Sequence, residues 1–265
     1  MSDRIILKVS DHIAEVIFNR PDKMNALDQQ SFDQLRNVAE EVKASPSIRA
    51  VYMYSRGEHF CSGADINFLQ GAVSDKAVFS ERAGKLEPGF DANEFQRPAL
   101  DWLDLNIPVV ACLQGVVYGA GAQIALAADF RICSPTLSFS LFEVNWGLIP
   151  DMGITQTLPR LVKSDVAAEL VMTGRVVKAQ EAWDIGLVTR VDDNPDKHCR
   201  ELVARLVSLS PDAVQRAKVL MRDAVKLNRA DALQLEARLQ SELVGSENQI
   251  EAARANLEKR RAVFK

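Results

Sequence analysis

The chain has 265 residues, 47% of them hydrophobic, so it can bury one large core or a core with an appendage. Its 32 basic and 36 acidic residues give a net charge of −4 and are interspersed over most of the length, which argues against a broad basic face for nucleic acid. No apolar run approaches the roughly 18 residues of a membrane span, and the first residues lack the apolar stretch of a signal peptide. We therefore expect a cytoplasmic protein with neither a nucleic-acid nor a membrane partner.

The first predicted elements are two strands, at residues 4–10 and 13–19, where apolar and polar residues alternate. Residues 49–55 are rich in β-forming side chains and predict a third strand. Between them, Asp28 is expected to cap a helix, because the apolar residues that follow it recur at helical spacing. Strand, strand, helix and strand is thus the first pattern along the chain.

A second cycle of the same kind follows a less regular segment. Residues 71–98 combine glycine, serine, proline and charged residues without clear periodicity, so we expect a mobile surface loop with short helical pieces, which either lines a binding groove or has no function. Strands are then predicted at 108–113 and 130–133, on either side of a helix of small residues at 121–128. The repetition predicts a mixed α/β core of stacked strand-strand-helix units.

From Ser164 onward the sequence becomes predominantly helical. Pro211 is well placed to open one of the helices. We divide the chain into an α/β core over residues 1–195 and an α-helical region over residues 196–265. The three long helical stretches of this last part are expected at residues 197–208, 211–227 and 230–260.

The cysteines and histidines predict no metal or redox chemistry. None of the four cysteines belongs to a C-x-x-C pair of the kind that zinc and redox sites use. We expect them to be reduced, mostly buried thiols. The three histidines are scattered and form no pattern typical of a nucleophile or a metal site. The cysteines are Cys61, Cys112, Cys133 and Cys199.

Two turns built from small residues are candidates for binding an anion or an oxyanion. In HFCSGADI, Gly63 ends a strand-like run and successive backbone N–H groups follow at Ala64 and Asp65. In the second turn, residues 118–122 lead directly into the predicted helix, so their N–H groups lie at a helix N-terminus without intrahelical acceptors. Either turn alone has a structural alternative, since glycine also serves tight turns. Together they favour a pair of converging donors.

Several motifs in order along the chain resemble the crotonase, or enoyl-CoA hydratase/isomerase, superfamily. The resemblance implies a crotonase-like spiral of strand-strand-helix repeats with a C-terminal α-helical trimerisation region, and a homotrimer or a homohexamer made of two trimers. It also implies an acyl-CoA thioester substrate held by two backbone N–H groups, which by position are those of Ala64 and Ala120. The motifs are NRPDKMNAL (19–27), FCSGADI (60–66), QGVVYGAGAQIALAADFRI (114–132), the block 143–153 and TGRVVKAQEAWDIGLVTRV (173–191).

The same resemblance assigns the acid and base groups. In family hydratases two glutamates handle the added water; one matches Glu143, and the other lies where this sequence has Gln123, which cannot exchange a proton at neutral pH but can hold a water. Asp151 is placed like the aspartate of the family's dienoyl-CoA isomerases, which protonates the far end of the diene after a glutamate has taken the proton next to the thioester. Those isomerases carry a further aspartate at the position of Gln123. An aspartate between proline and glycine can also simply shape a turn.

The remaining site residues are carried over from the family's substrate-binding segments. The backbone around Ala26 is expected to contact the pantetheine or adenine part of CoA. The basic and aromatic C-terminal tail is expected to reach CoA in a neighbouring subunit. The full set of expected substrate- or CoA-binding residues is Ala26, Ser62, Asp65, Ile66, Gln123, Lys259 and Phe264.

Three hypotheses follow for the function. The first is an acyl-CoA isomerase that converts 3,5-dienoyl-CoA to 2,4-dienoyl-CoA, with Glu143 and Asp151 as its catalytic residues. The second is an enoyl-CoA hydratase of fatty-acid oxidation, in which Glu143 manages the water with help from Gln123. The third is a non-catalytic relative that binds RNA, against which the slightly acidic charge argues. No cofactor is expected beyond the CoA carried by the substrate, because the thioester itself accepts the electrons once its oxygen is held.

Overall fold

The chain begins with the predicted pair of strands. The computed structural model describes residues 3–265, apart from the side chains of residues 72 and 73, and in it β1 (Ile5–Ser10) pairs antiparallel with β2 (Ile13–Phe18). Asp11 and His12 between them have φ values of 50° and 67°, the left-handed conformation that a tight two-residue hairpin turn requires. Four more strands join in parallel and complete a sheet in the order β1-β2-β3-β4-β6-β9, with β3 (Ala50–Ser55), β4 (Val109–Leu113), β6 (Phe130–Cys133) and β9 (Arg190–Val191).

A second sheet of three strands completes the repeats. It has the order β5-β7-β8, formed by Val116–Tyr118, Ser138–Ser140 and Val177–Lys178. From β4 to β7 the strands alternate between the sheets, since β4 is followed by β5, and β6 by β7. Helix α5 (Gly119–Leu126) follows β5 and is buried along its whole length. This alternation is the predicted spiral of strand-strand-helix units.

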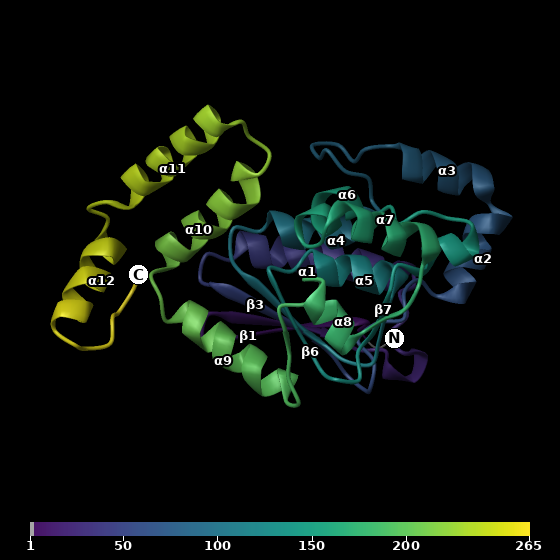
Figure 1. The fold of residues 1–265 in the computed structure, drawn as a ribbon, viewed down its shortest axis with the longest axis horizontal. Coiled ribbons are helices and arrows are strands. Elements are labelled where there is room, and N and C mark those ends of the chain that lie inside the picture. Colours follow the sequence, from purple (N-terminus) through teal and green to yellow (C-terminus); the bar gives the residue numbers. More distant parts are fainter. Residues whose placement is uncertain (1–2) are drawn as a thin grey trace.

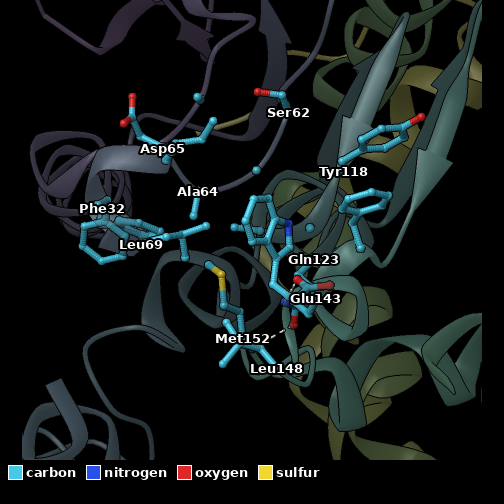
Figure 2. A pocket seen from close by; sticks show the side chains of 18 of the residues that line it. Phe32, Ser62, Ala64, Asp65, Leu69, Tyr118, Gln123, Glu143, Leu148 and Met152 are labelled. Carbon is cyan, nitrogen blue, oxygen red and sulfur yellow. Dashed lines mark hydrogen bonds between the residues drawn. The ribbon is translucent and has the colours of Figure 1, made fainter. Parts of the chain in front are cut away.

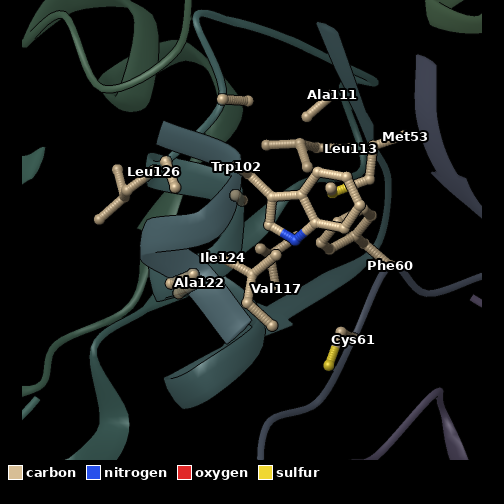
Figure 3. Packing of buried hydrophobic residues seen from close by; sticks show 14 of the residues in the cluster. Met53, Phe60, Cys61, Trp102, Ala111, Leu113, Val117, Ala122, Ile124 and Leu126 are labelled. Atoms are coloured by element: carbon tan, nitrogen blue, oxygen red, sulfur yellow. The ribbon is translucent and has the colours of Figure 1, made fainter. Parts of the chain in front are cut away.

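Helix α1 (Gln29–Ala44) forms as the capping signal predicted. The Asp28 side chain accepts a hydrogen bond from Ser31 N at 2.9 Å and so satisfies one of the free donors of the first turn. Its apolar face is buried against the core and against helix α4 (Arg97–Asp104). In that core Trp102 packs with residues from several strands and from α5, as Figure 3 shows. All four cysteines are buried and free, as predicted.

The segment before α4 contains more helix than its sequence predicted. Residues Ile66–Ser74 form α2 and Lys76–Gly84 form α3, whose N-caps are Asp65 and Asp75. No residue of α3 is buried, so this helix has no apolar stripe that could show as a helical period. The expected short helical pieces are therefore present, and they border the cavity described below.

Four helices form the C-terminal part, and the last two lie away from the sheets (Figure 1). The first of the four packs on the large sheet, where Cys199 and Val203 join Tyr52, Val110 and Ile132 in a second core. The helical stretch predicted at 230–260 consists of two helices, because the helix is interrupted at Gly245, which has a φ of 80°. The helices are α9 (Pro195–Val207), α10 (Pro211–Ala224), α11 (Arg229–Leu243) and α12 (Glu247–Leu257). Among residues 3–265, no helix is both long and apolar enough to cross a membrane.

A buried ion pair ties α10 to the core. Lys218 Nζ lies 2.8 Å from Asp129 Oδ2 and donates to Ile107 O at 2.9 Å. Burial lowers the pKa of Lys218, and the neighbouring Asp129 acts in the opposite direction. Asp129 Oδ2 also accepts from Val109 N at 2.7 Å, so this aspartate joins a strand, the end of α5 and the C-terminal region.

Candidate active site

A cavity of about 830 Å³ lies at the N-terminal end of α5 and is bordered by the motifs singled out in the sequence. Ser62 and Ala64 line it from the segment between β3 and α2, Gln123 from α5, and Glu143 from the 3-10 helix η2 (Phe142–Trp146). Figure 2 shows how these side chains border one space. Residues that are far apart in sequence thus meet where the predicted donors and carboxylates can act on one ligand.

The two glycine-containing turns meet beside this cavity. Tyr118 N donates to Cys61 O at 2.9 Å, which joins the segment after β3 to the strand that precedes α5. Gly63 has a φ of +98°, and a Cβ there would lie 3.1 Å from Tyr118 O and 3.7 Å from Ala120 N. A Cβ on Gly121 would lie only 2.6 Å from the Cβ of Cys61. Glycine is needed at both positions because the two backbones approach so closely.

Each turn places at the cavity one residue that is a candidate backbone donor. Leu27 N donates to Gly63 O, and Asp65 N donates to Leu27 O, both at 2.8 Å, so the N–H of Ala64 between them points away from Leu27. The N–H of Asp65, a donor in the sequence prediction, is therefore already used. Ala120 is the second residue of α5, where an N–H has no acceptor within the helix. Ala64 and Ala120 both line the cavity, as an oxyanion site requires.

Gln123 holds Glu143 in place through both ends of its amide group. Met152 N donates to Gln123 Oε1 at 2.8 Å, and Gln123 Nε2 donates to Glu143 Oε1 at 2.7 Å. Because a backbone N–H can only donate, it fixes which end of the amide faces the carboxylate. Among the described residues, none is a hydrogen-bond partner of the buried Glu143 Oε2. Burial raises the pKa of Glu143, while the bond from Gln123 acts in the opposite direction.

Asp151 lines the same cavity as Glu143. The 3-10 helix that carries Glu143 ends at Gly147, which has a φ of 70°, and the chain then turns back through Gly153 with a φ of 78°. Asp151 is exposed toward the cavity, yet the groups around it displace enough solvent to raise its pKa. Its charge also raises the pKa of Glu143, since like charges disfavour each other. The site thus holds two carboxyl groups that keep their protons more tightly than usual.

The NRPDKMNAL loop is held against this site by Arg20, whose role the sequence did not reveal. Arg20 Nη1 donates to Asp65 Oδ2 at 2.6 Å and to Ala26 O at 2.9 Å. The other oxygen of Asp65 caps α2 through Asn67 N. Asn25 is 2% exposed, and its Oδ1 accepts from Arg20 N at 2.7 Å. Arg20 and Asn25 therefore shape the loop that presents Ala26.

The expected binding residues separate into two groups. Ala26, Ser62 and Asp65 line the cavity, as do Ile66 and Gln123. Lys259 and Phe264 do not line it. They belong to the C-terminal end of the chain, which lies away from α2 and α3 in Figure 1. Phe264 O accepts from Arg49 Nη2 at 3.1 Å. Their expected contact with CoA concerns a neighbouring subunit and stays a prediction.

Comparison with known proteins supplies the family. Residues 8–265 match the enoyl-CoA hydratase/isomerase family. The putative enoyl-CoA hydratase/isomerase YngF of Bacillus subtilis is 33% identical over 100% of this chain and 99% of its own. The (E)-benzylidenesuccinyl-CoA hydratase of Thauera aromatica is 32% identical over 83% of each chain. A putative enoyl-CoA hydratase from Streptomyces coelicolor superposes with a TM-score of 0.89 at 30% identity, covering 99% of this chain and 94% of its own. The chain therefore belongs to the enoyl-CoA hydratase/isomerase family of the crotonase superfamily.

Proposed function

We propose that the protein is an acyl-CoA isomerase that converts 3,5-dienoyl-CoA to 2,4-dienoyl-CoA with Glu143 and Asp151 as its two proton carriers. One observation carries the proposal: both carboxyl groups line a single cavity, while the residue hydrogen-bonded to Glu143 is a glutamine. An amide cannot exchange protons at neutral pH. The two side chains able to move protons are thus Glu143 and Asp151. Two separate carboxyl groups suit a reaction that removes a proton from one carbon and adds one to a distant carbon.

The reaction needs one proton removed and one added. Glu143, which lines the cavity, takes the proton from C2, and the electron pair moves onto the thioester oxygen. The N–H groups of Ala64 and Ala120 hold that oxygen, each supplying about 3 kcal/mol of transition-state stabilisation. Asp151 then gives its proton to C6, which leaves double bonds at C2 and C4. Transfer of the proton from Glu143 to Asp151 restores the site.

Burial raises the pKa of both carboxyl groups. The raised pKa brings Glu143 closer to neutral pH, where a general base works best. The raised pKa of Asp151 favours the protonated form that an acid needs.

Enoyl-CoA hydration is the second candidate, favoured by the names of the relatives. In this reaction Glu143 takes a proton from water as the oxygen attacks C3, and the same group returns a proton to C2. Gln123 Nε2 has a second hydrogen that can orient the water. Asp151 has no part in this scheme.

Two variants separate the candidates. Asp151→Asn is expected to abolish the diene shift and leave any hydration intact, because only the shift needs an acid at C6. Glu143→Gln is expected to abolish both. Both reactions are followed by ultraviolet absorbance on purified protein, with the thermal unfolding of each variant as a check on folding. Diene formation by Asp151→Asn at the rate of the unmodified protein would contradict the proposed role of this aspartate.

We also propose that the protein works as a homotrimer or a homohexamer. In that assembly the tail with Lys259 and Phe264 reaches the CoA of a neighbouring subunit. Sedimentation of the purified protein, with and without an acyl-CoA, tests the assembly. A monomer that is fully active would contradict it.

A further inference from the structure

Four phenylalanine rings, from three helices and one connecting segment, form one side of the cavity. Phe32 comes from α1, Phe68 from α2, Phe79 from α3, and Phe95 from the segment before α4. The ring centroids of Phe79 and Phe95 are 4.8 Å apart in a stacked arrangement, and those of Phe32 and Phe68 are 5.2 Å apart. Phe68 lies edge-on to both Phe79 and Phe95, at 6.2 Å. We call these four rings the aromatic wall.

The aromatic wall is anchored at its base and accessible at its surface. Phe32 and Phe95 are 4% and 5% exposed, so they form a fixed floor. Phe68 and Phe79 are half-buried. Arg82 lies over the Phe95 ring at 5.2 Å and is paired with Glu94 at 2.6 Å, which holds the end of α3 against this floor. The wall is therefore a preformed surface with a face left open to the cavity.

The polar groups of the cavity lie elsewhere. Its described polar side chains belong to residues 22–23, 62–67 and 118–151, and neither α1 nor α3 contributes one. The volume of about 830 Å³ is near the upper end of the range for small-molecule sites, roughly 300–1,000 Å³. Part of this space is lined by residues expected to contact CoA, such as Ala26. The wall itself offers its occupant only apolar contacts.

We propose that the natural substrate is an acyl-CoA whose acyl group ends in an aromatic ring, and that this ring packs on the aromatic wall. This inference rests on the proposed function only in taking an acyl-CoA thioester as the ligand. An aryl ring can extend the stacked and edge-on geometry already present among the four side chains, with centroids 4.5–7 Å apart. Such contacts add about threefold to tenfold in affinity beyond the apolar area alone, which an alkyl chain also buries.

The test measures binding of saturated thioesters, which the proposed chemistry cannot turn over. Calorimetric titration of the full-length protein with 3-phenylpropanoyl-CoA, nonanoyl-CoA and butanoyl-CoA compares an aryl group with an alkyl chain of equal carbon number and with a short chain. We expect the phenyl ligand to bind about threefold to tenfold more tightly than nonanoyl-CoA. Phe68→Leu and Phe79→Leu, at half-buried positions, are expected to remove this preference and leave butanoyl-CoA binding unchanged.

Phe90→Leu is the matched control, since Phe90 lies on Arg97 and does not line the cavity. It should retain the aryl preference. Equal or tighter binding of nonanoyl-CoA to the unmodified protein would overturn the aryl assignment alone, as would an unchanged preference in both wall variants. Failure of all three thioesters to bind would overturn the acyl-CoA assignment, and the aryl proposal with it.

Discussion

Replacing Gln123 with methionine tests how the site positions its base. Methionine has nearly the same volume, so the change creates no cavity, but it removes two hydrogen bonds. Glu143 Oε1 loses a donor at 2.7 Å, and Met152 N, in a residue only 4% exposed, loses its acceptor at 2.8 Å. A hydrogen bond to a charged group contributes about 1.5–3 kcal/mol, and an orphaned buried donor costs about 1–3 kcal/mol.

Two measurable effects follow from these values. If the bond to Glu143 aligns its reacting oxygen, Gln123→Met lowers kcat about 10- to 100-fold, since each 1.36 kcal/mol is tenfold in rate. KM should change little. The pKa of Glu143, already raised, rises further because the bond that lowers it is gone, so the acidic limb of the pH–rate profile moves to higher pH.

The assay is diene formation from 3,5-dienoyl-CoA at several pH values, with thermal unfolding measured in parallel. The positioning role would be refuted if Gln123→Met lost stability but kept kcat within twofold of the unmodified protein, with the acidic limb of its pH–rate profile unchanged. Gln123→Glu is a useful companion. Two carboxyl groups at this separation share one proton, so this variant should gain hydration.

Three further predictions concern stability and backbone packing. The raised pKa of Glu143 means that the folded chain holds this proton more tightly than the unfolded chain, so stability falls as pH rises through the folded pKa. Glu143→Gln should therefore raise Tm at pH 8 and leave it unchanged at pH 4. Calorimetry measures both, and equal effects at the two pH values would contradict this. Lys218→Met leaves Asp129 unpaired and should cost about 3 kcal/mol in urea unfolding, whereas a loss below 0.5 kcal/mol would show the pair to be dispensable. Gly121→Ala should destabilise the protein by about 1–3 kcal/mol and lower kcat, because the new Cβ forces the two donor turns apart. Gly71→Ala, with open space around its Cβ, is the control. Equal losses of stability and kcat in the two variants would contradict the role of close backbone packing.

Local signals in the sequence predicted the elements well where burial was periodic. Asp28 and the apolar spacing behind it located α1, and alternation located β1 and β2. Helix α3 lacked any such signal because none of its residues is buried. The break between α11 and α12 did have a local signal in the sequence. Gly245 ends the first helix, and Ser246 caps the second by accepting from Gln249 N.

The residues of the candidate site were predictable from the sequence, but the hydrogen bonds between them were not. The resemblance placed Ala64, Ala120 and Glu143, and the structure brings them to one cavity. The bond from Met152 N to Gln123 joins residues 29 positions apart, and no local pattern encodes it. The use of the Asp65 N–H by Leu27 likewise depends on two loops that meet only in the fold.

In the proposed reaction Glu143 and Asp151 move protons along a diene. The most direct test offers the purified protein 3,5-dienoyl-CoA and trans-2-enoyl-CoA separately and follows the ultraviolet absorbance of the product in each case. We expect formation of the 2,4-diene from the first substrate and little loss of the second. Rapid hydration of the enoyl thioester without any diene formation would contradict it and leave Asp151 as a residue that shapes a turn.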